Sequence, residues 1–327
     1  MVLEKKTRKW RWGVNRWIIL GLIILSVVGT KIADPVQPHI QVAPEAIMHE
    51  PLFTLPVIGD FYLTNTILAM LLMDVVIILI ALAVRNGARK NGMVPKGIAG
   101  AFEMLVDMLY NLTETTAGKF TKKVFPWFAT IMIMVLFANL IKLVPGFETI
   151  GVLEESSTNG HAIQAVGGNW YTLVAGEEAH EGYVLAPFFR ALSTDLNFTL
   201  ALALISVVMT QIIGVQAQGI RYFSKFLNFT TMFKKPFFGF MDFIVGLLET
   251  ISEFSKILSF TFRLFGNMFA GMVLMALVGA MIPVFVPSMI MMFELFIGAI
   301  QAFVFGMLTM TFMAQATQGH GGEEEHA

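Results

Sequence analysis

Five long apolar stretches constrain the fold of this chain more than any other feature. They cover residues 62–84, 125–144, 197–216, 237–281 and 288–316. About 20 apolar residues in a helix span the hydrocarbon core of a bilayer, where the backbone must satisfy its hydrogen bonds internally. The chain is 56% hydrophobic and only 14% charged, against a charged share of about 25% in ordinary globular domains. We therefore expect an all-α integral membrane protein with about five spanning helices.

The positions of basic residues predict how these helices are oriented. Lys and Arg are concentrated in cytoplasmic loops, and they follow the first and third apolar stretches, at residues 85–90 and 221–235. The first helix is thus expected to run inward. This pattern favours a multi-pass protein of a bacterial plasma membrane with a cytoplasmic C-terminus.

The two C-terminal stretches are unusually long. Residues 237–281 would reach about 67 Å as a helix, whereas the hydrocarbon core is about 30 Å thick. No proline interrupts either interior. We expect residues 237–316 to form a hairpin of two long, strongly tilted helices.

The composition of the other segments predicts their place in the chain. Residues 1–33 combine a basic start with a short apolar run, which is typical of a signal peptide or an N-terminal anchor. Residues 95–124 alternate apolar and charged positions, which indicates an amphipathic helix on the inner surface. The predicted regions are 1–33, an outer segment at 34–61, two spanning helices with the surface helix between them at 62–146, an acidic outer loop or small subdomain at 147–190, a spanning helix with a basic inner loop at 191–236, the hairpin at 237–316 and a cytoplasmic tail at 317–327.

One arginine lies in the middle of an apolar stretch. A charge near the bilayer centre costs at least about 2.5–3.5 kcal/mol, so Arg263 is expected to serve a function and to have a partner. At about 100° per residue, five other polar residues lie within roughly 40° of Arg263 on the helix. They are Glu249, Ser252, Lys256, Ser259 and Asn267. The pattern indicates a wet groove that reaches partway across the membrane, although a structural polar seam between helices is an alternative.

The predicted topology gives these polar residues a depth. Glu249 lies toward the cytoplasm, and Arg263 lies near the middle. On the last helix, Glu294 lies in the outer half, and Gln301, two turns further, comes level with Arg263. Two carboxylates on opposite sides of a permanently charged guanidinium suit stepwise proton transfer without a direct leak. A mobile carboxylate must then pass the arginine, and we expect a partner subunit to supply it.

Other functional classes find little support in the sequence. The chain has no cysteine and only six histidines, all in polar connecting regions or the tail, so we expect no metal site and no cofactor. A net charge of −1 suggests no nucleic-acid partner. No Ser–His pair lies within the spans, so we expect no catalytic residues. A self-contained ion or anionic-solute transporter that uses Arg263 stays open as an alternative.

Three sequence motifs carry a resemblance to a known family. They are Arg263-Leu264-Phe265-Gly266-Asn267-Met268-Phe269-Ala270-Gly271, Gln301-Ala302-Phe303, and Asn139-Leu140 with Leu143-Val144-Pro145. In order and spacing, the chain from about residue 62 to 316 resembles subunit a of the F-type ATP synthase.

This resemblance implies a non-catalytic stator subunit in the bilayer beside the ring of c subunits. Two offset half-channels would load and unload the ring carboxylates, with Arg263 facing them. Partners would include b-type peripheral stalk subunits and, indirectly, the catalytic head. Glu249, Lys256, Asn267 and Gln301 fall on the family's polar channel positions.

The chain departs from the family pattern at two positions in the outer half. Many bacterial members have a carboxylate where this chain has Met272, and a histidine where it has Glu294. The resemblance therefore implies that the outer carboxylate has moved to the last helix.

Overall fold

The computed structural model describes most of residues 41–318. Short gaps fall at residues 49, 57–58, 92–96, 145, 157–159, 169, 180–181, 227–235 and 283–285. Residues 16–22, 24–25 and 28 are also described and are helical. Most of the predicted signal or anchor segment and nearly all of the tail lie outside the described residues.

Long helices dominate the described part of the chain. Each of five helical segments is long and apolar enough to cross a membrane, so the predicted membrane fold is confirmed. One of these segments, Ala99–Ile141, combines α3, η1 and α4. The long helices are α2 (Asn65–Asn91), α3 (Ile98–Ala117), α4 (Thr121–Ile141), α5 (Leu196–Gln218), α7 (Pro236–Met281) and α8 (Val286–Thr317). The short 3-10 helices are η1 (Gly118–Phe120), η2 (Leu192–Thr194) and η3 (Gly219–Lys225).

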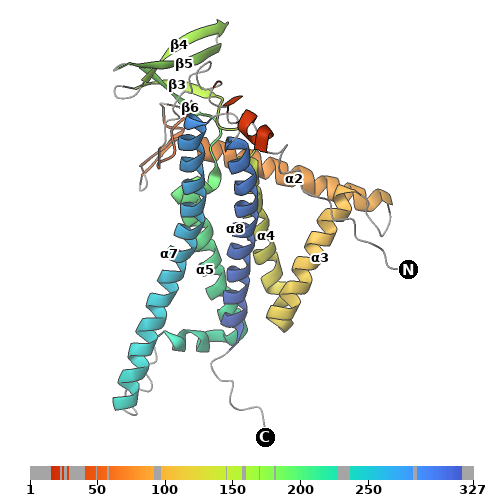
Figure 1. Ribbon diagram of the computed structural model, residues 1–327. Coiled ribbons are helices and arrows are strands. Elements are labelled where there is room, and N and C mark those ends of the chain that lie inside the picture. Colours follow the sequence, from red (N-terminus) through yellow and green to blue (C-terminus); the bar gives the residue numbers. More distant parts are fainter. Residues whose placement is uncertain are drawn as a thin grey trace, which may run out of the picture. The chain divides into compact units, whose positions relative to one another are not determined.

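The two C-terminal helices are long and unbroken, as predicted. Helix α7 has 46 residues and α8 has 32 (Figure 1). At about 1.5 Å per residue, α7 extends about 69 Å, more than twice the thickness of a hydrocarbon core. Pro236 is its first residue, a position where the missing N–H would have no helical partner. Strong tilting in the membrane stays a prediction.

The described residues form two compact units. One, which we call the helical unit, contains Gln41–Val152, Ala186–Ala270 and the part of the chain from Leu295 onward. The other, which we call the sheet unit, contains Leu153–Leu185 and Gly271–Glu294.

A four-stranded sheet occupies the predicted outer loop. Its strands are β3 (Gly151–Ser156), β4 (Gly160–Gly167), β5 (Trp170–Ala179) and β6 (Gly182–Pro187), in the order β3-β6-β4-β5. Strands β4 and β5 pair antiparallel with two register shifts. Sequence analysis predicted a loop or subdomain here but no strands, because glycines and glutamates interrupt the alternation that marks a strand. A second, smaller hairpin joins β1 (Phe53–Leu55) to β2 (Gly59–Phe61).

Helices α3 and α4 form a hairpin through η1 (Figure 1). Leu109 on α3 and Val124 on α4 are fully buried in one hydrophobic cluster with Met310 and Met313 of α8. The predicted surface helix is therefore present as α3, and its apolar face packs inside the helical unit. Its location at the inner membrane surface stays a prediction.

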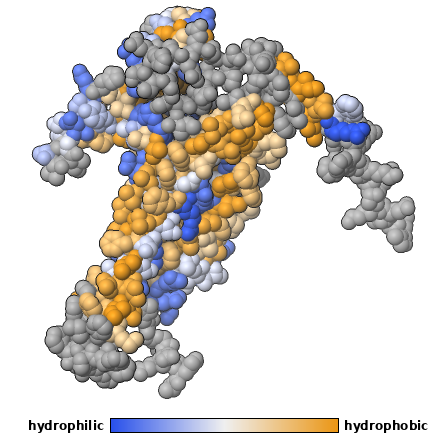
Figure 2. All heavy atoms as spheres, turned by 60° about the vertical axis from the view of Figure 1, so that its left-hand side comes forward, coloured by the Kyte–Doolittle hydropathy of each residue, from blue (hydrophilic) through white to orange (hydrophobic). Residues whose placement is uncertain are grey.

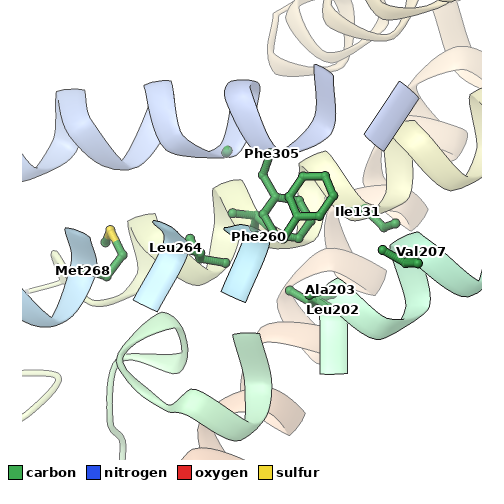
Figure 3. Packing of buried hydrophobic residues seen from close by; sticks show 10 residues of the cluster. Ile131, Leu202, Ala203, Val207, Phe260, Leu264, Met268 and Phe305 are labelled. Carbon is green, nitrogen blue, oxygen red and sulfur yellow. The ribbon is translucent and has the colours of Figure 1, made fainter. Parts of the chain in front are cut away.

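The hydrophobic core of the helical unit draws on four helices. Phe260 and Leu264 of α7 pack against Phe305 of α8, together with Ile131 of α4 and Val207 of α5 (Figure 3). The rings of Phe260 and Phe305 are 4.8 Å apart between centroids. This packing turns one face of α7 inward and so directs the polar stripe along a different face.

Buried polar pairs supplement this core. Asn139 of α4 is fully buried; its Nδ2 donates to the Gly298 carbonyl of α8 at 3.0 Å, and its Oδ1 accepts from Ser193 Oγ at 2.6 Å. The hydroxyls of Ser206 on α5 and Thr309 on α8 lie 2.8 Å apart. Such pairs join helices where apolar association is weakly driven.

Arg190 fastens the segment before α2 to the chain before α5. The guanidinium donates to the carbonyls of Gln41, Val42 and Ala43, and it is only 5% exposed. Burial lowers the pKa of Arg190, while the nearby carboxylates, Asp195 foremost, oppose that shift. An arginine remains charged under such a shift. Arg190 therefore donates several hydrogen bonds that hold the two segments together, and we call this arrangement the Arg190 clasp.

Candidate functional site

The polar stripe of α7 forms one wall of a groove in the helical unit. The groove has a volume of about 320 Å³. Its lining residues are Ser252, Ser255, Lys256, Ser259, Phe260 and Arg263 of α7, with Leu308 and Phe312 of α8. Figure 2 shows a narrow band of hydrophilic and intermediate residues crossing an otherwise hydrophobic face. Four predicted site residues, Ser252, Lys256, Ser259 and Arg263, thus lie together, and the other four lie outside the lining.

Arg263 is partly exposed and has little intramolecular compensation. Its Nη2 donates to Ser259 Oγ, one turn earlier on α7, at 3.2 Å. Among the residues that the structure describes, it forms no salt bridge, whereas Lys225 and Lys256 do. A guanidinium in an apolar setting needs a counter-charge.

Asn267 and Gln301 meet one turn beyond Arg263. Asn267 Nδ2 donates to Gln301 Oε1 at 3.0 Å and so links α7 to α8. The Gln301 side chain is 5% exposed, and its buried Nε2 has no hydrogen-bond partner within the described residues. A buried donor of this kind is uncommon in proteins, and it leaves one N–H pair available for an incoming oxygen.

Glu294 lies in the sheet unit, where it is 7% exposed. Its Oε1 fills the space beside Gly271, so that a Cβ at Gly271 would overlap the carboxylate. Gly271 directly precedes Met272. The structure therefore brings the carboxylate of α8 to the level of α7 at which sequence analysis noted a missing carboxylate.

Glu253 is a buried carboxylate that sequence analysis did not select. Its Oε1 accepts from Lys256 Nζ at 2.9 Å and from Lys225 Nζ at 3.2 Å, and its Oε2 accepts from Gln211 Nε2 at 2.9 Å. Tyr222 in turn donates to Gln211 Oε1 at 2.7 Å. At about 100° per residue, Glu253 lies about 80° from Arg263 on the helix and falls outside the stripe. Its i,i+3 spacing to Lys256 was the available signal.

Glu249 lies at the far end of the stripe from Asn267. Its carboxylate is 3.4 Å from Lys225 Nζ, and its side chain is 34% exposed. The structure thus places Glu249 in a charge cluster beside the groove, and not in the groove lining. Within the described residues, no three or more His, Asp or Glu side chains form a group that could hold a metal ion.

Comparison with known proteins shows the family to which the chain belongs. A family model described as "ATP synthase A chain" matches residues 67–314. The chain belongs to the ATP synthase A chain family. The polar stripe, the groove and the Asn267–Gln301 bond all fall within the matched residues.

Individual relatives of this ATP synthase family match over most of their length. The ATP synthase subunit a of Moorella thermoacetica is 26% identical over 246 residues, covering 75% of this chain and 88% of that relative. The subunit of Propionigenium modestum named "ATP synthase subunit a, sodium ion specific" is 28% identical over 322 residues, covering 94% of this chain and 93% of that relative. ATP synthase subunit a 1 of Syntrophotalea carbinolica is 27% identical over 257 residues, covering 79% and 86%.

Membership in the ATP synthase A chain family confirms the resemblance seen in the sequence. The chain is a multi-pass, non-catalytic membrane subunit of an ATP synthase, and it translocates ions as part of the stator. The alternative of a self-contained transporter is thereby set aside.

Proposed function

We propose that this chain moves protons through two offset half-channels and that Arg263 separates them by pairing with the carboxylates of a rotating c ring. The observation that carries the proposal is the state of Arg263. It lines an open groove, bonds only to a serine hydroxyl, and has no salt bridge in the described part of the chain. A rotor carboxylate would supply the missing counter-charge at each step.

The groove would form the inner half-channel. It extends from Ser252 to Arg263 and is lined by three serine hydroxyls and Lys256. Hydroxyls and the water between them can carry a proton. Under the predicted topology this end of α7 faces the cytoplasm.

The opposite half-channel would use Glu294 and Gln301. Glu294 precedes Gln301 by seven residues in the sequence of α8. A proton from outside would reach Glu294, then the ring carboxylate near Asn267 and Gln301. In the assembled complex, the stator would be held beside the ring by b-type stalk subunits in a bacterial plasma membrane.

The experiment that tests the proposal is ATP-driven proton uptake in inverted membrane vesicles. Native protein is compared with Arg263→Ala after both are shown to assemble with the c ring. We expect assembly to persist and uptake to fall to background. Uptake that survives the substitution would contradict the proposed role of Arg263.

The transported ion requires its own arm of this experiment, because one relative is named as sodium ion specific. The same vesicles are assayed for ATP-driven ²²Na⁺ uptake and for acidification in sodium-free buffer. Acidification without added Na⁺ supports proton coupling. Sodium uptake with no acidification would replace the proton by Na⁺ in the proposal and leave the role of Arg263 unchanged.

A further inference from the structure

Lys256 places a second positive charge in the same groove as Arg263. The two residues are seven positions apart on α7, which is about 10.5 Å along the helix axis, and both line the groove. A rotor carboxylate that meets Arg263 would also lie within the influence of an unpaired lysine, whose ammonium sits on a flexible four-carbon stem. A groove with two available cations would offer that carboxylate two binding positions instead of one.

In the structure, Lys256 is paired with a carboxylate of its own chain and is therefore not available to bind the rotor carboxylate. Its Nζ is 2.9 Å from Glu253 Oε1, and it lies 4.7 Å from the centroid of the Phe312 ring. Glu253 is on a different face of α7 and is buried, with 11% of its side chain exposed. The ion pair therefore draws the ammonium toward the protein interior and neutralises it.

We propose that Glu253 is a positioning residue that holds Lys256 away from the rotor path, so that Arg263 is the cation that the rotor carboxylate meets. This inference rests on the proposed function, since it assumes that a rotor carboxylate passes Arg263. Glu253 itself does not touch the ion in this scheme and acts only through Lys256.

The ion pairs around Glu253 show which lysine would lose its counter-charge if Glu253 were removed. Lys225 would keep Glu249 at 3.4 Å and the rings of Tyr222 and Phe226, each at 4.5 Å from its ammonium. Lys256, in contrast, has one salt bridge among the described residues, and it is to Glu253. Removal of the Glu253 charge thus frees the lysine that lines the groove.

The test is a double-mutant cycle in the assembled ATP synthase. Glu253→Gln keeps the shape of the side chain and can still accept from Gln211, while Lys256→Met keeps the length of the lysine stem without its charge. ATP-driven ion uptake is measured in inverted vesicles for each single variant, for the double variant and for Arg263→Ala. Assembly with the ring is checked for each.

We expect Glu253→Gln to slow uptake at least about fivefold. Even in water, two unit charges 4 Å apart attract by an energy that corresponds to about a fivefold change in an equilibrium constant. In the Lys256→Met background the same substitution is expected to have no further effect, so the double variant should match Lys256→Met within about twofold, whatever the rate of Lys256→Met itself. Loss of the Glu253→Gln effect in this background is the decisive result, since a structural or ion-carrying role of Glu253 would persist after Lys256 is removed. The conservative Glu253→Asp, which keeps the charge, is expected to fall between native and Glu253→Gln and to lose its effect in the Lys256→Met background in the same way.

Two outcomes would overturn the inference. One is a double variant at least about fivefold slower than Lys256→Met, and the other is a fully assembled Glu253→Gln that works at the native rate. If Glu253→Gln does not assemble, the Glu253→Asp pair decides by the same criterion. The Arg263→Ala control separates this inference from the proposed function. Uptake that survives in Arg263→Ala refutes the function itself. Loss of uptake in Arg263→Ala, together with a double variant that is slower than Lys256→Met, refutes only the role of Glu253.

Discussion

Loss of the hydrogen bond between Asn267 and Gln301 should cost more stability when Asn267 is replaced than when Gln301 is replaced. Gln301 is buried, with Oε1 accepting from Asn267 and Nε2 lacking a partner among the described residues. Asn267, in contrast, is exposed. Asn267→Leu therefore leaves a buried amide with neither group bonded, and an unsatisfied buried group costs about 1–3 kcal/mol.

Gln301→Leu removes the same hydrogen bond but also removes the unbonded donor. Side-chain hydrogen bonds between membrane helices contribute about 0.6 kcal/mol on average and at most about 1.7 kcal/mol. Relief of the buried N–H offsets this loss, so the net change in unfolding free energy should be close to zero. We expect Asn267→Leu to be the more destabilising variant by about 1–3 kcal/mol, and the double variant to match Gln301→Leu.

The assay is reversible unfolding of the subunit in mixed detergent micelles, followed by circular dichroism, for both single variants and the double variant. Equal destabilisation of the two single variants, or a larger loss for Gln301→Leu, would refute the reasoning. Ion uptake supplies a second comparison. Because a buried unbonded donor persists against its cost in stability, we expect Gln301→Leu to slow uptake while leaving stability nearly unchanged.

Two further substitutions test the surroundings of the site. Gly271→Ala would place a methyl group on the Glu294 carboxylate, so we expect a severalfold loss of ATP-driven uptake in vesicles with normal assembly, and native uptake would contradict the observed packing. Arg190→Gln would remove a buried cation that bonds three carbonyls and lies near Asp195. We expect a loss of about 3–5 kcal/mol in unfolding free energy, seen as a lower thermal midpoint and faster proteolysis of residues 41–46, and an unchanged midpoint would show that the clasp is dispensable.

The helices follow from the sequence more readily than the sheet does, for a physical reason. A bilayer demands about 20 apolar residues per helix, a signal so strong that all five spanning segments could be placed from composition alone. The four-stranded sheet has no such constraint. Its strands pair in the order β3-β6-β4-β5, with register shifts in the β4–β5 ladder, and pairing of that kind depends on contacts between distant residues.

The candidate site shows the same division. The stripe from Ser252 to Asn267 follows from the helical period, because one helix places residues on a face without help from any neighbour. Contacts across helices do not follow from that period. Glu253 was missed because its partners, Lys225 and Gln211, come from η3 and α5, and only tertiary packing brings them to it.

The sequence by itself determined that this chain crosses a membrane, that Arg263 stands in an apolar setting, and that its motifs are those of an ATP synthase subunit. Local chemistry and the helical period are sufficient for each of these. Only the tertiary structure decided that Arg263 lines an open groove without a salt bridge to any described residue, while Lys256 is neutralised by Glu253. Whether a charge is paired depends on side chains that approach from other helices, and no spacing along one helix encodes that approach.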